Sequence, residues 1–395
     1  LLGAVALLAP GERATAAPGS LPMSPGERVV LIGVDGVLPD EIDYLLAHGD
    51  LPNLAERVRA GGVVAAYRRP AEEPPAAFWT TVATGLAPAQ HGVVSLDTYR
   101  PLGVTTPLAR SGPWRAYWRG VEAPIGLAEY RPLLAHGRRA PAVWELAARG
   151  GAPVAALGWW ATYPAEPLPG LVLAHDAYHL LLEGAPGAVA PEERRPDLEE
   201  LARATEPGPF QEAVASALPE TQARGALDRA LLPDRFLREV ARREGARQPK
   251  VLALYQPAAD LLAEGWTAGE LPLEYLLRLQ LVEIDALVGE LAEGVGTLVV
   301  LFDPGRRGSG EGRAVVWRGS CTAGKRPQVD PRALGSGLLR AAGMPQSREL
   351  PPPPDFCFWP PPPATVDRFG ARELAEAPED GGTEYLESLR SLGYL

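Results

Sequence analysis

The sequence has little of several residue types that mark common functional classes. Only two of its 395 residues are lysine, Lys250 and Lys325, no basic run occurs, and the net charge is −11. An acidic chain without a basic run argues against nucleic acid or an anionic membrane as the main partner. Beyond the N-terminus, no stretch of the sequence is long and apolar enough to predict a span across a bilayer.

Cysteine and histidine, which are common ligands of zinc, are also scarce. The two cysteines, Cys321 and Cys357, form either one disulfide in an oxidising compartment or two unpaired thiols, and both alternatives fit the sequence. The five histidines all precede residue 180, so the second half of the chain has no imidazole: His48, His91, His136, His175 and His179.

The N-terminus is apolar and then rich in small residues. LLGAVALLAP is followed by GERATAAPGS, in which Ala14, Thr15 and Ala16 form a candidate cleavage site. This pattern resembles the end of a signal peptide, so we predict that residues 1–27 are a signal-peptide remnant and linker. The protein is then expected to be exported, to the periplasm or outside the cell. The alternative is an apolar, disordered tail.

Continuous apolar runs alternate with helical patterns along the chain. RVVLIGVDG, GGVVAAYRR, APVAALGWW, KVLALYQ and GTLVVLFDPG each read as strands, and the first is typical of a parallel strand buried on both faces. PDEIDYLLAHG reads as a helix with Asp40 as its N-cap and Gly49 at its end. Strands that alternate with helices predict an α/β fold, with a mostly parallel central sheet and helices on both faces.

We expect one domain over residues 28–350, with irregular cap insertions near 102–139 and 175–232. Insertions of that length in an α/β fold usually cover the site face. Residues 351–395 begin with PPPPDFCFWPPPP, which predicts an extended polyproline II segment, and end with the short amphipathic helix EYLESLRSLGYL. For the proline-rich part, a rigid tether held to the body by its aromatic residues is favoured over a partner-binding motif.

Three acidic residues follow predicted strands. Asp35 and Asp303 end their strands directly, and Asp260 follows KVLALYQ after a short loop. Ligands of open α/β sheets lie outside the C-terminal strand ends, where these carboxylates would converge. Because like charges repel, such a group usually holds a cation or a proton. The pattern therefore predicts a metal site at this edge.

An ordered set of motifs carries a family resemblance. VVLIGVDG, LPNLAERVRAGG, FWTTVATGLAPAQHG, VWELAARGGAPVAALGWWATYPAEP, YQPAAD, LVVLFDPG and VDPRALGSGLLRAAGMP occur in that order. Together they resemble the alkaline phosphatase superfamily, in its type I phosphodiesterase/nucleotide pyrophosphatase branch. The resemblance covers residues 28–345 and the LRSLGYL ending. It implies an alkaline phosphatase-like fold and two divalent metals, often zinc, on either side of a Thr or Ser nucleophile.

The chain departs from this family at the nucleophile. The family's Thr or Ser lies nine residues before the Thr of the TG pair, and counting back from Thr84 gives Pro75. Proline suits the first turn of a helix, so the backbone is preserved without the hydroxyl. Thr80 and Thr81 lie roughly 7–9 Å further along the helix axis. Attack geometry tolerates errors of only about 1 Å, so we assign both to helix packing.

The metal motifs also lack histidine. Asp35 stands at the family's first ligand position, but Asp260 is followed four residues later by Glu264 and Asp303 is followed by Pro304, where the family has His. The segment RRGSGEGRAVVW, where the last family His is expected, contains none. We therefore expect no two-zinc site, and either no metal or one divalent cation, Mg²⁺ or Ca²⁺.

The histidines in the first half of the chain do not replace the missing ligands. His91 lies in the family's TG-x-x-P-x-x-HG pattern, outside the ligand positions, and is predicted to be a hydrogen-bonded structural residue. His175 and His179 are four residues apart and would share one face of a helix. A metal bound there would lack an evident third ligand.

Three functional hypotheses follow. The favoured one is a catalytically degenerate family member that binds a small phosphoester ligand or presents a surface to an exported protein. The second is a weak phosphoester or phosphodiester hydrolase, in which an all-carboxylate set binds Mg²⁺ or Ca²⁺ and activates water: Asp35, Asp260, Asp303 and Glu264. The third is an exported structural or interaction protein that uses its proline-rich tail. The sulfatase branch is disfavoured because its modified residue would stand at Pro75.

Overall fold

The computed structural model describes most of the chain. The described residues are 23–70, 73–103, 121, 125–208, 222–265, 273–308, 310–319, 321–322, 326–370, 372 and 382–392. The predicted signal-peptide remnant therefore lies almost wholly outside the described residues, as do parts of both predicted insertions. Within the part of the chain that the structure describes, no helix is both long and apolar enough to cross a membrane.

One sheet of eight strands forms the centre of the molecule, in the order β2-β10-β9-β1-β8-β5-β6-β7. The block from β9 to β6 is parallel, while β10 runs antiparallel to both of its neighbours and β7 is antiparallel to β6. The bounds are β1 (Val29–Asp35), β2 (Gly62–Arg68), β5 (Val154–Leu157), β6 (Gly170–Leu173), β7 (Val189–Ala190), β8 (Val251–Gln256), β9 (Thr297–Asp303) and β10 (Glu311–Trp317). The five predicted strands are β1, β2, β5, β8 and β9.

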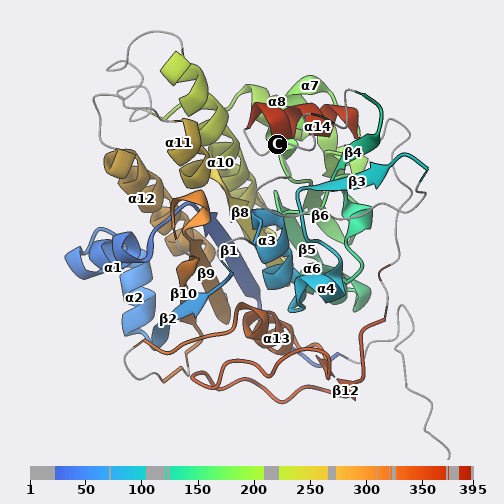
Figure 1. Ribbon diagram of the computed structural model, residues 1–395. Helices are drawn as coiled ribbons and strands as arrows, with labels where there is room; N and C mark the ends of the chain where they lie inside the picture. Colours follow the sequence, from blue (N-terminus) through green and yellow to red (C-terminus); the bar gives the residue numbers. More distant parts are fainter. Residues whose placement is uncertain are drawn as a thin grey trace, which may run out of the picture.

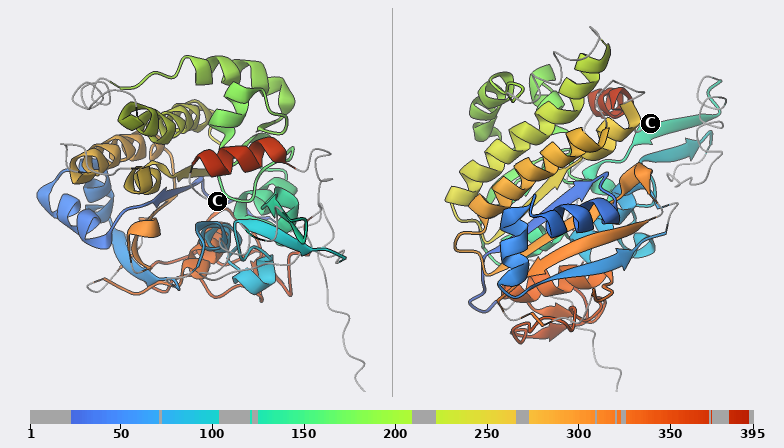
Figure 2. Two further views of the ribbon diagram at one scale, coloured as in Figure 1. Left: turned by 45° about the horizontal axis from the view of Figure 1, so that its top comes forward. Right: turned by 90° about the vertical axis from the view of Figure 1, so that its left-hand side faces the viewer.

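Helices cover both faces of this sheet (Figures 1 and 2). One face carries α1 (Pro39–His48), α2 (Pro52–Arg59), α10 (Gln222–Ala246) and α12 (Leu273–Leu291), and the other carries α3 (Pro75–Thr84), α6 (Val143–Arg149) and α13 (Pro331–Ala341). The further helices are α4 (Pro88–His91), α7 (Ala177–Glu183), α8 (Arg195–Arg203), α11 (Ala258–Gly265) and α14 (Thr383–Ser391). The predicted α/β architecture with a mostly parallel sheet is confirmed.

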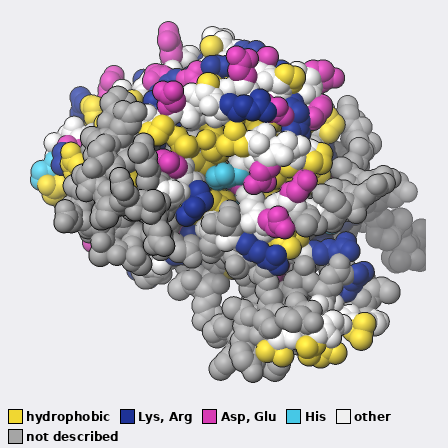
Figure 3. All heavy atoms as spheres, turned by 90° about the horizontal axis from the view of Figure 1, so that it is seen from above, with side chains coloured by type: hydrophobic (Ala, Val, Ile, Leu, Met, Phe, Trp, Pro, Cys, Tyr) yellow, Lys and Arg dark blue, Asp and Glu magenta, His cyan; other side chains and the backbone are white. Residues whose placement is uncertain are grey.

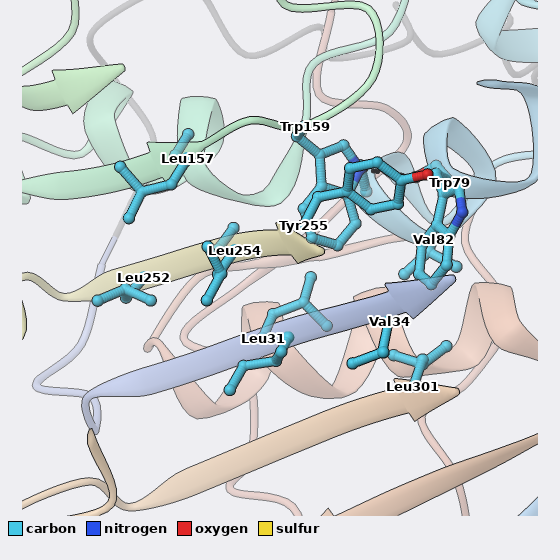
Figure 4. Packing of buried hydrophobic residues seen from close by; sticks show 14 of the residues in the cluster. Leu31, Val34, Trp79, Val82, Leu157, Trp159, Leu252, Leu254, Tyr255 and Leu301 are labelled. Carbon is cyan, nitrogen blue, oxygen red and sulfur yellow. Dashed lines mark hydrogen bonds between the residues drawn. The ribbon is translucent and has the colours of Figure 1, made fainter. Parts of the chain in front are cut away.

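The core continues to the C-terminal ends of the central strands as a group of aromatic side chains. Trp79 of α3, Tyr255 of β8 and Trp159 pack against one another there, with ring centroids 5.2–6.1 Å apart (Figure 4). Gly33 in β1 makes room for this group, because a Cβ at that position would lie 2.5 Å from the Trp79 ring. The small residue in the strand thus determines how closely α3 approaches the sheet.

Two local predictions need correction. Helix α1 begins at Pro39, with Leu38 rather than Asp40 as its N-cap residue. The Leu38 N–H donates to the Glu41 side chain at 2.8 Å, and proline at the first helical position needs no N–H partner. Gly49 ends the helix as predicted, with φ of 79°. The segment 175–232 is also less irregular than predicted, because its described part contains α7, β7 and α8.

The C-terminal segment lies along the body of the protein. Cys321 and Cys357 form a disulfide, which settles the alternative that the sequence left open. Trp359 is buried, lies against Gly337 of α13 and donates from Nε1 to the Pro354 carbonyl at 2.7 Å. Further along, α14 packs against α7 and β4 (Ala128–Pro132), which pairs with β3 (Asp97–Pro101). The aromatic residues of the proline-rich part therefore fasten it, as predicted.

Candidate active site

The register of the central strands brings the predicted carboxylates together. Asp35 ends β1 and Asp303 ends β9, and the two are direct partners in the parallel ladder. Asp260 lies in the first turn of α11, which follows β8 on the other side of β1. All three carboxylates are buried, with 0%, 0% and 1% of Asp35, Asp260 and Asp303 exposed. The three acidic residues therefore lie together at one edge of the sheet.

Asp35 accepts hydrogen bonds from the aromatic group. Trp79 Nε1 and the Tyr255 hydroxyl both donate to Asp35 Oδ2, at 2.9 and 2.8 Å, and the Gly36 N–H lies 3.1 Å from Oδ1. Burial and the charges of Asp260 and Asp303 raise the pKa of Asp35 well above its usual value, although the Trp79 and Tyr255 hydrogen bonds oppose this shift. Both carboxylate oxygens therefore already have partners from the protein.

Asp303 is paired with Arg69, which follows β2. Arg69 Nε and Nη2 lie 3.0–3.1 Å from the carboxylate oxygens, and the side chain of Arg69 is 5% exposed. The Tyr67 hydroxyl and the Gly305 N–H add hydrogen bonds of 3.0 and 2.9 Å. Burial raises the pKa of Asp303, and the charge and hydrogen bonds of Arg69 act against it.

Asp260 is enclosed by Arg306, in the short 3₁₀ turn η3 (Gly305–Arg307) that follows β9. The Arg306 N–H donates to Asp260 Oδ1 and the Arg306 side chain donates from Nε to Oδ2, both at 2.8 Å. The next residue, Arg307, donates to the Gly36 carbonyl and to Glu41, so η3 is held on both sides. One turn of chain thus covers the open side of the carboxylates.

The carboxylate set does not fit the metals that the family implies. Gly305 has φ of 57°, and a Cβ there would lie 2.2 Å from Asp260 Oδ1 and 2.7 Å from Asp35 Oδ1. The backbone of η3 therefore approaches both carboxylates, and guanidinium groups take up the oxygens of Asp260 and Asp303. Among the residues that the structure describes, no group of three or more His, Cys, Asp and Glu is arranged to hold a metal ion.

The two remaining predicted positions supply little to this centre. The backbone of Glu264 lies in α11, one turn after Asp260, and its side chain lies outside the described residues. Pro304 directly precedes η3 in a helical conformation, with φ of −68° and ψ of −11°. Its ring starts the turn that places Arg306 over Asp260. Proline here acts through the backbone and offers no ligand.

Pro75 is the first residue of α3, so the helix begins where the family's nucleophile is expected. Thr80 and Thr81 are buried within the helix, as predicted from their spacing. The Thr81 hydroxyl is 3.0 Å from His91 Nε2, whereas the Thr80 hydroxyl has no hydrogen-bond partner among the described residues. Neither hydroxyl lies at the start of the helix.

The histidines are engaged in structural contacts. His91 accepts from the Val93 N–H at 3.1 Å, and burial together with the charge of Arg138 lowers its pKa to about 3, so it is neutral. His175 precedes α7 instead of sharing its face with His179, stacks on Trp160 and hydrogen-bonds Tyr385 of α14 at 2.9 Å. His175 and His179 therefore do not share a helix face, contrary to the expectation from their spacing.

His179 has a carboxylate partner of its own. Its Nδ1 lies 2.6 Å from Asp176 Oδ1, and Asp176 also accepts from Ser388 of α14. Burial lowers the pKa of His179, but the charge and hydrogen bond of Asp176 outweigh it and raise the pKa overall. These polar contacts attach α14 to the start of α7.

A cleft of roughly 1180 Å³ lies beside α3, between the end of β2 and the start of α13. Three of its polar side chains are bonded within the protein: Arg69 to Asp303, Arg332 to Asp330 and Thr81 to His91. On the face shown in Figure 3, the described Arg and Lys side chains are interspersed with Asp and Glu. No continuous basic surface appears among the described residues of that face.

Sequence reasoning missed the cations of this site. Arg69 follows β2 in the motif YRRP, and Arg306 follows β9 in DPGRRG, two strands whose ends point to the same edge. Arginines placed directly after strand ends were the available signal. The search for histidine ligands left these residues unassigned.

The family model for type I phosphodiesterase/nucleotide pyrophosphatase matches residues 29–302 of the chain. Crystal structures of phosphonoacetate hydrolase from Sinorhizobium meliloti 1021, in complex with phosphonoformate or phosphonoacetate, are similar at 14% identity, with TM-scores of 0.44 and 0.42. The match covers 74% of this chain and 59% of that protein, so the chain spans less than two thirds of its length. No curated relative matches the chain significantly.

Proposed function

Because the chain belongs to the type I phosphodiesterase/nucleotide pyrophosphatase family, within the alkaline phosphatase superfamily, we propose that it is a non-catalytic member of that family. In this proposal the edge that carries out hydrolysis in the family serves here as a structural centre. The remaining role is non-covalent: binding of a small phosphoester ligand, or presentation of a surface to another exported protein.

The observation that carries the proposal is the chemistry at the start of α3. Pro75 occupies the first helical position and has neither a hydroxyl nor an N–H. Thr81 and Thr80 lie deeper in the helix, and both are buried. A nucleophile must be placed within about 1 Å of its productive position, and these hydroxyls are five and six residues away along a rigid helix.

The carboxylates support the same proposal from the metal side. Asp260 and Asp303 accept hydrogen bonds from arginine side chains, and Asp35 accepts from Trp79 and Tyr255. A metal would have to displace Arg69, whose side chain is 5% exposed, from Asp303, and Arg306 from Asp260. Removing one partner of a buried ion pair costs about 3–5 kcal/mol, so displacement is unfavourable.

The test combines metal analysis with an assay. Purified protein is analysed for zinc, magnesium and calcium, and is incubated with a nitrophenyl phosphodiester. We expect no stoichiometric metal and no turnover above buffer. Turnover that Asp35→Ala abolishes would overturn the proposal, and would favour the hydrolase hypothesis if one Mg²⁺ or Ca²⁺ were bound. Turnover that Asp35→Ala leaves unchanged identifies a contaminant.

The interaction hypothesis has its own test. Because the proline-rich part is fastened by Trp359 and the Cys321–Cys357 disulfide, removal of residues 351–395 would also disturb the body. Phe358 is 68% exposed and allows a smaller change. If the tail recruits a partner, Phe358→Ser abolishes capture of that partner from the periplasmic fraction without altering the Tm.

Export is proposed as well, and the disulfide supports it, since such bonds persist in oxidising compartments. Thiol labelling of the protein taken directly from its native cells is the test. Labelling of both cysteines without prior reduction would contradict export.

A further inference from the structure

We propose that the guanidinium groups of Arg69 and Arg306 are the built-in counter-cations of the Asp35–Asp260–Asp303 edge, in the place of divalent metal ions. This inference deepens the proposed function and rests on it, because it says what became of the metal site in a non-catalytic member. It also assigns a specific role to two residues that lie outside the family motifs.

The need for cations follows from burial. Three carboxylates at one edge of the sheet, each at most 1% exposed, repel one another in a region from which water is largely excluded. Each buried charge costs several kcal/mol unless a partner compensates it. The resemblance of the sequence to the family implies that other members meet this requirement with metal ions. The described surroundings of the three carboxylates contain two guanidinium groups that face them directly.

Arg306 pairs with Asp260 through both its backbone and its side chain. Its backbone N–H and its side-chain Nε reach different oxygens of Asp260, both at 2.8 Å. The preceding Gly305 is so close to Asp35 and Asp260 that it has no space for a Cβ. The turn therefore contributes a charge and also fills the volume around it.

Arg69 does the same for Asp303 from the opposite side. Two of its nitrogens face the carboxylate at 3.0–3.1 Å, and its Nη2 also donates to the Gly305 carbonyl at 3.2 Å. Arg69 and Arg306 are thus linked through η3. Arginine stays charged at all accessible pH values and its planar group suits a carboxylate, but it cannot coordinate a water or phosphoryl oxygen and lower its pKa as a metal ion does. The substitution preserves the fold while excluding Lewis-acid chemistry.

The test is to remove one counter-cation and ask whether a metal replaces it. Thermal unfolding and titration calorimetry are run with CaCl₂ and with MgCl₂ on wild type, Arg306→Ala and Arg307→Ala. Arg307 is the matched control, because it lies in the same turn but pairs with Glu41. Wild type and Arg307→Ala are expected to show no cation-dependent change in Tm. Arg306→Ala is expected to bind one cation, which raises its Tm by about 3 °C or more at saturating cation.

Several outcomes would overturn the inference. It fails if Arg306→Ala has the same Tm as Arg307→Ala and gains nothing from either cation. It also fails if wild type binds Ca²⁺ or Mg²⁺ with a dependence on Asp260. If Arg306→Ala folds only when a cation is added, this result supports the inference. If Arg306→Ala folds neither with nor without cation, the same measurements on Arg306→Gln decide by the same criteria.

The inference and the proposed function can fail separately. Hydrolysis by wild type would defeat the proposed function, whatever the variants bind. Metal binding by wild type in the absence of turnover would defeat the counter-cation inference and leave the non-catalytic proposal intact.

Discussion

Two buried ion clusters in this protein use the same kinds of side chain with opposite results. At the edge formed by β1, β9 and α11, three carboxylates face two guanidinium groups. In the second cluster, two carboxylates face two guanidinium groups. The carboxylates belong to Glu145 of α6 and to Glu166, and the guanidinium groups belong to Arg138 and Arg372. We call these the edge cluster and the α6 cluster.

The α6 cluster stabilises Glu145 in the ionised form. Arg138 binds Glu145 through two nitrogens at 2.6 and 2.8 Å, and Arg372 Nε adds a bond at 3.0 Å. Burial opposes the charge of Glu145, but the charge and hydrogen bonds of Arg138, together with Arg372 and the Ala142 N–H, lower its pKa to about 2. In the edge cluster the pKa values of Asp35 and Asp303 are raised instead.

The difference shows that burial alone does not decide the state of a carboxylate. The carboxylates of Asp35, Asp260 and Asp303 in one cluster and of Glu145 in the other are buried, so the desolvation penalty is present in each. What differs is the ratio of acids to guanidinium groups. A balanced cluster is an internal salt bridge network, whereas in a cluster with surplus acid the repulsion between carboxylates is only partly compensated.

The largest expected effect comes from breaking the balance of the α6 cluster. Glu145→Gln leaves Arg138 and Arg372 buried without their shared carboxylate, and should lower the free energy of unfolding by about 4 kcal/mol. Urea denaturation measures this. Glu56→Gln, at an exposed position of α2, is the control and should change it by less than about 0.5 kcal/mol. A loss below about 1 kcal/mol for Glu145→Gln would mean that the network contributes little.

The disulfide fastens the same C-terminal segment that supplies Arg372. It closes a loop with a sequence separation of 36 residues, for which chain entropy predicts a contribution of about 4 kcal/mol. The double variant Cys321→Ser/Cys357→Ser should show this loss, and reducing agent should shift wild type equally while leaving the double variant unchanged. Equal denaturation midpoints for wild type and double variant would refute the prediction.

His175, which hydrogen-bonds Tyr385 of α14, predicts that the stability of the protein depends on pH. Burial lowers the pKa of His175 to about 4, although Asp176 opposes the shift, and its value in the unfolded chain is about 6.5. The unfolded state therefore binds more protons in this interval. As pH falls from about 6.5 to about 4, protonation of His175 should lower the free energy of unfolding of wild type by about 3 kcal/mol.

His175→Gln isolates this contribution, since glutamine does not titrate. The difference in unfolding free energy between pH 7 and pH 4 should be smaller in His175→Gln than in wild type by the same amount. Parallel pH profiles for the two proteins would show that His175 is not held neutral. The titration of His91 contributes equally to the unfolding free energy of both proteins, so it does not affect the difference between them.

The smallest effect is expected where acid is in surplus. Asp35→Asn puts a side chain that cannot ionise where burial and two neighbouring carboxylates raise the pKa, and it keeps an acceptor for Trp79 or Tyr255. It should raise the free energy of unfolding by about 1 kcal/mol at pH 7. The decisive feature is that the free energy of unfolding should rise in Asp35→Asn, whereas it should fall in Glu145→Gln. A loss of about 3 kcal/mol or more in a denaturation experiment would show that the two clusters are balanced alike.

Much of the architecture could be predicted from short-range pattern. The five buried strand runs, the helices between them and the end of α1 at Gly49 are all local properties of composition and periodicity. The convergence of Asp35 and Asp303 also followed, because strands that run parallel bring their final residues to one edge. The error at Asp40 arose because the proline after Leu38 started the helix two residues earlier than an N-cap at Asp40 implies.

The sequence by itself determined the fold, the three acids at the strand ends and the absence of a hydroxyl at Pro75, since each depends on residue identity and local period. Only the tertiary structure decided which cations the acids meet. Arg69 lies 234 residues from Asp303, and Arg372 lies 227 residues from Glu145. An ion pair over such a separation depends on where folding places two distant segments, and the charge balance of each cluster depends on that placement.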